Sequence, residues 1–149
     1  MNFEFEFTLV AALKAPVEIG AGPFGVRTFY EVSSATVEGK RIKGKGLTGG
    51  GDWILIGSDG FGRLDVRAQL LTEDGVSIYA YYPGLLELNQ KVGEALATGG
   101  STDYADQYFR TTPRFECGDP RYAWLNQSLF VAEGRFGPSM VEYKVYRIT

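Results

Sequence analysis

Residues 49–67 read GGGDWILIGSDGFGRLDVR, and this stretch predicts two short β-strands joined by a tight turn. The turn is Asp59-Gly60, a pair that favours the positive backbone angles of a two-residue hairpin loop. Asp65 and Arg67 lie two positions apart in the second strand, so their side chains point to one face and their aliphatic neighbours to the other. A charged pair on one strand face is either a solvated ion pair or the polar end of a binding pocket. The function of the protein depends on which of the two it is.

The rest of the chain is also typical of an all-β protein. It contains 20 glycines, and turn pairs separate short β-branched and aromatic runs. Residues 3–9 alternate apolar and polar, as in a half-buried strand, and residues 85–97 have apolar side chains at helical spacing. Further strands are expected at residues 26–33, 35–46, 54–56, 62–72, 77–82, 104–112, 123–133 and 141–147. Short strands with one short helix predict a single antiparallel β-barrel, or a barrel-like sandwich, over one domain, residues 1–149.

Composition excludes several classes of function. The net charge is −3, which argues against nucleic acid as a partner, and no apolar run approaches the length of a membrane span. Histidine is absent, so a Ser-His-Asp triad and a His-ligated zinc are excluded. Cys117 is the only cysteine, which indicates a reducing cytoplasm and a small buried side chain rather than a nucleophile. We therefore expect a cytoplasmic protein whose proton chemistry uses carboxylates, tyrosines or arginines.

Counting alternate residues extends the face of Asp65 and Arg67 into later strands. Tyr79 and Tyr81 share one face of the next strand. The same parity aligns further residues of this kind: Tyr108 with Arg110, and Tyr122 with Trp124 and Asn126. If this face lines the barrel interior, it forms a pocket with a few placed polar groups; if it is the outer, wet side, such residues are ordinary there. The repeated tyrosines and the Trp124-Leu125-Asn126 run favour the pocket.

The ordered motifs of the chain resemble a bacterial and fungal family, domain-of-unknown-function family 3237, also called uncharacterised protein family 0311. The residues that carry the resemblance are Pro16-Val17, Gly25-x-Arg27, Gly49-Gly50-Gly51-Asp52-Trp53, Leu64-Asp65-Val66-Arg67, Ile78-Tyr79, Tyr108-Phe109-Arg110-Thr111, Phe115-Glu116 and Arg121-Tyr122-Ala123-Trp124-Leu125-Asn126. The resemblance covers nearly the whole chain. It implies a small barrel akin to allene oxide cyclases and dirigent-like proteins, or a calycin-like one. Those relatives steer the cyclisation or coupling of hydrophobic small molecules in an apolar cavity without a cofactor, but no general reaction of the family is established.

These observations lead to a cofactor-independent isomerase, cyclase or lyase acting on a small aromatic or enone-like metabolite. Asp65, or Glu116, is the expected acid or base, with Arg67, Tyr79 and Arg110 as its catalytic partners. The ligand-binding residues are expected to be Arg27, Trp53, Tyr81, Tyr108, Phe115, Trp124 and Asn126, with no metal site and no cofactor. The alternative is a non-catalytic barrel that binds the same kind of small hydrophobic ligand. A third reading is an assembly module, and a homodimer or higher homo-oligomer is expected because the aliphatic face of residues 64–70 needs burial.

Overall fold

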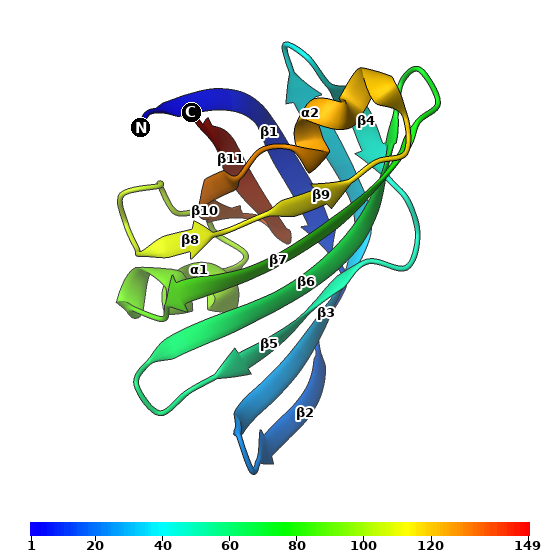
Figure 1. Ribbon diagram of the computed structural model, residues 1–149. Helices are drawn as coiled ribbons and strands as arrows, with labels where there is room; N and C mark the ends of the chain where they lie inside the picture. The colour runs from blue at the N-terminus through cyan, green and yellow to red at the C-terminus, as the bar shows by residue number, and fades with distance from the viewer.

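Eight antiparallel strands close into a barrel in the computed structural model, which describes residues 1–149 (Figure 1). The strands are β1 (Phe3–Leu13), β2 (Val17–Gly22), β3 (Gly25–Gly39), β4 (Lys43–Gly46), β5 (Gly51–Ile56), β6 (Phe61–Thr72), β7 (Ser77–Glu87), β8 (Phe109–Thr111), β9 (Arg114–Glu116), β10 (Phe130–Gly137) and β11 (Met140–Ile148). The ring runs β1-β3-β5-β6-β7-β8-β10-β11 and returns to β1. Of the three extra strands, β2 pairs with β3, β4 with both β3 and β6, and β9 with β7. The predicted all-β antiparallel barrel is confirmed.

The helical segments differ from the prediction. Helix α1 spans Gln90–Thr98 rather than 85–97, because β7 continues through Glu87 and the Asn89 side chain caps the helix by accepting the Val92 N–H at 3.0 Å. The strand expected at 123–133 was wrong over its first half: η1 (Pro120–Tyr122) and α2 (Ala123–Asn126) occupy it, and β10 begins at Phe130. The Asp119 side chain accepts the Arg121 N–H at 2.9 Å and so starts this helical segment. None of these helices has the length and apolar character needed to cross a membrane.

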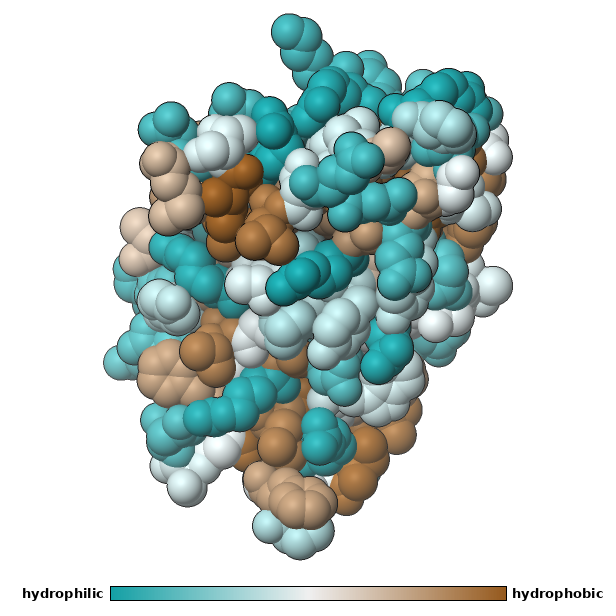
Figure 2. All heavy atoms as spheres, in the orientation of Figure 1, coloured by the Kyte–Doolittle hydropathy of each residue, from teal (hydrophilic) through white to brown (hydrophobic).

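The barrel interior holds one core of 26 buried residues. In β6, Leu64, Val66 and Leu70 point inward and are at most 5% exposed. The aliphatic face that suggested a homo-oligomer is thus largely buried within the chain itself, and the oligomer stays a prediction. Hydrophobic side chains do reach the surface around the β2–β3 hairpin at the lower end of the molecule, where Val17, Ile19, Phe24 and Val26 are exposed (Figure 2).

The predicted alternation in β1 breaks down at Glu6. A β-bulge shifts the pairing of β1 with β11 between Phe5 and Phe7, so the side chains before and after the bulge follow different parities. Phe3 and Phe5 are consequently exposed, whereas Glu6 is only 7% exposed. Its carboxylate accepts hydrogen bonds from Arg41 Nε at 3.0 Å and from Arg147 Nε at 2.8 Å. Glu6 thus joins an arginine of the β3–β4 connection to an arginine of β11.

Candidate functional site

A cavity of about 90 Å³ lies inside the barrel, at the end that α1 covers. Its lining has 18 residues, of which 16 are hydrophobic, and they come from β1, β3, β5, β6, β7, β8, β10, β11 and the α1 region. The two exceptions are Thr28 and Asp52. No lysine or arginine lines the cavity. An apolar chamber with a single carboxylate is therefore the most distinctive internal feature of the molecule.

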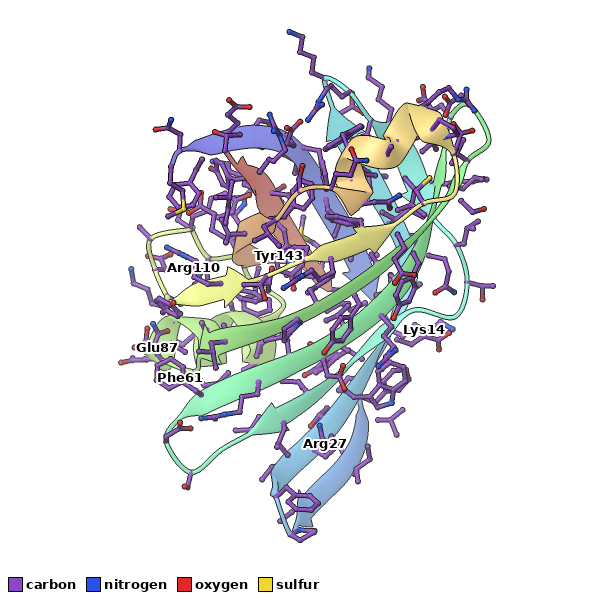
Figure 3. All side chains as sticks on the ribbon, in the orientation of Figure 1. Lys14, Arg27, Phe61, Glu87, Arg110 and Tyr143 are labelled. Atoms are coloured by element: carbon purple, nitrogen blue, oxygen red, sulfur yellow. The ribbon has the colours of Figure 1, made fainter.

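Strand register places the polar groups of the cavity in one row. Tyr30 of β3 pairs with Asp52 of β5, Asp52 with Val66 of β6, and Val66 with Tyr82 of β7. All four side chains line the cavity. Tyr143 of β11 approaches from the opposite wall, and its ring packs edge-on against Tyr82 with 5.6 Å between centroids. Figure 3 labels Tyr143, which lies within the barrel behind β8 and β9. One carboxylate thus shares a small chamber with three tyrosines.

The Asp52 side chain is anchored by a backbone group of the neighbouring strand. The ladder between β5 and β6 is interrupted between the pairs Asp52–Val66 and Leu55–Arg63. In this gap Asp52 Oδ1 accepts the Asp65 N–H at 3.0 Å. The side chain therefore takes the place of a ladder hydrogen bond, which fixes the carboxyl group at the cavity wall.

Burial raises the pKa of Asp52 to about 7, and the nearby Asp65 charge acts in the same direction. The hydrogen bond from Asp65 N–H and the Arg27 charge oppose this shift without cancelling it. The carboxyl group therefore changes protonation state near neutral pH, as a general acid or base requires. Burial also raises the pKa of Tyr82, Tyr143 and Tyr30 above 10, so these phenols remain protonated hydrogen-bond donors.

The expectation that Asp65 and Arg67 face the interior was wrong. Their neighbours Leu64 and Val66 line the cavity, so alternation directs Asp65 and Arg67 to the outer surface. Tyr79 and Tyr81 follow the same parity in β7 and also lie outside. Arg67 Nη1 donates to the Tyr79 hydroxyl at 3.0 Å, and its guanidinium lies 5.1 Å from the centre of the Tyr81 ring. Arg67, Tyr79 and Tyr81 therefore do meet, but on the outer wall of the barrel, and Asp65 lies on the same face.

The remaining predicted residues of the outer wall lie apart from the cavity. Arg27 Nη1 donates to the Trp53 carbonyl at 2.8 Å, and the Trp53 ring stacks on Phe29 at the surface. Arg110 is exposed and lies over the half-exposed Tyr108 ring at 5.4 Å (Figure 3 labels Arg27 and Arg110). None of these four predicted side chains is among those that line the cavity.

Phe115, Trp124 and Asn126 were also expected in the pocket, with Glu116 as an alternative acid or base, and all four lie at the other end of the barrel. Phe115 is buried but packs against Phe7 and Phe130. Trp124 lies on α2 beneath the Arg41 guanidinium, 3.8 Å from it. Asn126 hydrogen-bonds the backbone of residue 117, and Glu116 is exposed. None of these side chains lines the cavity; Phe115, Glu116 and Asn126 instead line a separate open hollow together with Tyr79.

The cavity residues that sequence reasoning missed do carry a signal. Asp52 shares its parity with Ile54 and Ile56, Tyr82 with Ile78 and Ala80, and Tyr143 with the flanking valines. A polar group that interrupts an otherwise apolar strand face marks an inward-pointing polar side chain. No group of three or more His, Cys, Asp or Glu residues has the arrangement of a metal site.

Comparison with known proteins places this barrel in a family. The model of the family described as "Protein of unknown function (DUF3237)" matches residues 1–148, and the chain belongs to that family. A relative from Clostridium acetobutylicum, named as a UPF0311 protein, is 32% identical over 150 residues, covering 100% of this chain and 95% of the relative.

Solved structures share the fold. The crystal structure of a conserved protein of unknown function from Rhodopseudomonas palustris superposes with a TM-score of 0.92 at 29% identity, covering 99% of this chain and 97% of that one. A β-barrel-like protein from Acinetobacter baumannii superposes with a TM-score of 0.83 at 30% sequence identity, covering 99% of this chain and 96% of that one. A protein described as an enzyme from Penicillium herquei superposes with a TM-score of 0.72 at 16% sequence identity, covering 99% of this chain and 94% of that one. At this identity the likeness shows a common fold only.

Proposed function

We propose that this protein is a cofactor-independent isomerase, cyclase or lyase, in which Asp52 transfers a proton on a small aromatic or enone-like metabolite held in the barrel. The observation that carries the proposal is a carboxyl group of pKa about 7 inside an apolar cavity that also holds three protonated tyrosines. A perturbed carboxyl group in a cleft is a recognised mark of an acid–base site. In this proposal the acid–base residue is Asp52, inside the barrel, rather than Asp65.

The arrangement suits proton abstraction next to a carbonyl group. The Asp52 carboxylate takes a proton from the carbon α to the carbonyl, and the Tyr82 and Tyr143 hydroxyls donate hydrogen bonds to the oxygen as it becomes an enolate. Asp52 then returns the proton to another carbon, or the enolate closes a ring or expels a leaving group. Fixed donors in an apolar chamber stabilise such a charge better than water does. The absence of a basic side chain from the lining favours an uncharged substrate.

A carrier protein would need the apolar chamber but not the carboxyl group. A buried carboxyl group costs stability, and the Arg27 charge offsets only part of that cost for Asp52. Binding of an apolar ligand alone does not offset the rest. The presence of Asp52 at the cavity wall therefore favours catalysis over transport. Ligand binding without turnover would support the carrier instead.

A small unsaturated ketone tests the assignment. We expect the wild-type protein to convert cyclohex-3-enone to cyclohex-2-enone, followed by ultraviolet absorbance of the conjugated product. The Asp52→Asn variant is expected to lower kcat/KM by about 10²- to 10⁴-fold, because it removes the proton-transferring group. Tyr82→Phe removes an oxyanion donor and is expected to cost about 100-fold. Tyr79→Phe is the matched change on the outer wall and should leave turnover unchanged. Asp65→Asn removes a charge that raises the pKa of Asp52 and should cost far less turnover than Asp52→Asn. A loss confined to these two variants would overturn the assignment.

The pH dependence of turnover follows from the same carboxyl group. Asp52 acts as a base only when ionised, and its pKa is about 7. We therefore expect kcat/KM to rise with pH and to level off above a midpoint of about 7. An ordinary exposed aspartate would give a midpoint near 4. Rates measured between pH 4 and pH 9 distinguish the two, and a profile flat over this range would exclude Asp52 as the base.

A further inference from the structure

A second hollow adjoins the cavity on its outer side. It is a groove of about 300 Å³ between the end of β1 with the following loop, the C-terminal half of α1 and the β10–β11 turn. Leu13, Tyr30, Leu96 and Phe136 line both the groove and the inner cavity. The two hollows are therefore separated only by the side chains of a shared wall.

Leu96 shows how thin this wall is. Its side chain lines the inner cavity and also the groove, yet the residue is 49% exposed. The N-terminal end of α1 is fixed by the Asn89 cap and by an ion pair between Lys91 and Asp106. Its C-terminal end, which bears Leu96, stops at Gly99 in the left-handed conformation (φ 67°). One leucine near a helix end thus lies between the chamber and solvent.

We propose that the groove and the cavity are two compartments of one binding site, and that the ligand is a ring carrying an apolar chain. The ring lies in the cavity beside Asp52, and the chain passes the Leu96 wall into the groove. This inference rests on the proposed function and names the shape of its substrate.

The volumes support a two-part ligand. The cavity alone, at about 90 Å³, is below the 300–1,000 Å³ usual for small-molecule sites, and the groove brings the combined site into that range. The cavity has room for a reacting group of about one ring, so any larger substrate must extend outward.

The polarity of the groove supports an apolar chain. Seven of its 12 lining residues are hydrophobic. The lining includes Ala15, Pro16 and Met140. Its one charged side chain, Lys14, is paired with Glu31 at 2.9 Å (Figure 3 labels Lys14). A neutralised charge at the rim offers no anchor for an anionic group, whereas the apolar lining buries methylene groups.

Binding of 4-alkylphenols by calorimetry tests the proposal, with phenol, 4-ethylphenol and 4-butylphenol as probes. We expect affinity to rise by about two- to fourfold for each methylene group added, because each is buried in the groove. Met140→Trp fills the groove without reaching the cavity, so it should abolish the gain with chain length while phenol still binds. Ala15→Trp fills the same groove from the loop and serves if the first variant fails to fold. Leu64→Phe fills the cavity alone and should weaken all three phenols equally.

The outcomes separate the two proposals. Phenol binding that does not strengthen with chain length, or a gain that survives both tryptophan variants, would overturn the two-compartment site and leave the Asp52 proposal standing. Failure of the wild-type protein to bind any of the phenols would also overturn the two-compartment site, while turnover of cyclohex-3-enone decides the Asp52 proposal separately.

Discussion

The Asp52→Asn variant is expected to be more stable than the wild-type protein at pH 8 by about 2 kcal/mol, and to differ little from it at pH 4. The pKa of Asp52 is raised by burial from 3.8 to about 7 in the folded chain. Between these two values the unfolded chain has lost the proton that the folded chain keeps, so wild-type stability falls as pH rises through this window. The full shift corresponds to about 4 kcal/mol, and water reaching the carboxyl group reduces it by about half.

The asparagine removes the ionisation but keeps the anchor. Its Oδ1 still accepts the Asp65 N–H, so the local geometry of β5 and β6 is preserved. Urea unfolding followed by circular dichroism at several pH values between 4 and 8 measures the difference. Asp65→Asn removes a neighbouring charge that raises the pKa of Asp52, so its stability should still fall with rising pH, but by less than that of the wild type. Equal stability of wild type and Asp52→Asn at every pH would mean that the carboxyl group is solvated, and the acid–base proposal would lose its basis.

A variant that gains stability while losing turnover is the expected behaviour of an acid–base site. A carboxyl group in an apolar chamber lowers the stability of the folded protein, and it is useful only because it takes part in the reaction. The same change in a carrier would gain stability without losing ligand affinity. The two measurements on one variant therefore separate an enzyme from a carrier.

The barrel could be predicted from sequence because its signals are local. Asp59-Gly60 and Asp74-Gly75 are hairpin turns with a glycine at positive φ, and alternation in β6 is regular over its length. The helical segment at 120–126 could not be found by counting alternate residues, because Asp119 and Pro120 begin it through a cap. A strand pattern and a short helical turn are not distinguished by so few residues.

The candidate site was only partly predictable. Alternation groups Asp65 with Arg67 and both with Tyr79 and Tyr81, and the structure brings these side chains together on one face. Alternation does not say which of the two strand faces lies inside the barrel. The tyrosines on the face of Asp65 and Arg67 suggested that this face was the inner one. Tyrosine and arginine also pack well against each other on an outer wall, however. Asp52 among isoleucines on the apolar face was the more informative position.

The Glu6→Ala variant is expected to lose about 3 kcal/mol of stability at pH 7. Glu6 is 7% exposed and joins Arg41 to Arg147, so its removal leaves two guanidinium groups without their shared partner. Burial acts to raise the pKa of Glu6, but the hydrogen bonds from Arg41 and Arg147 outweigh it and the pKa is lowered. The carboxylate therefore contributes stability above the pKa of the unfolded chain, and this contribution is lost as pH falls through the lower folded value.

Glu4→Ala is the matched control, because Glu4 binds the same Arg147 but its side chain is 55% exposed. An exposed ion pair contributes less than about 1 kcal/mol, so this variant should unfold close to the wild type. Thermal and urea unfolding of both variants at pH 7 and pH 3 measure the two effects. The difference in unfolding free energy between the wild type and Glu6→Ala should be smaller at pH 3 than at pH 7. Protonation of Glu6 weakens the ion pairs of the wild type, and the variant already lacks them. Equal losses of unfolding free energy from Glu4→Ala and Glu6→Ala would show that Glu6 is solvated, and that its ion pairs contribute no more than exposed ones.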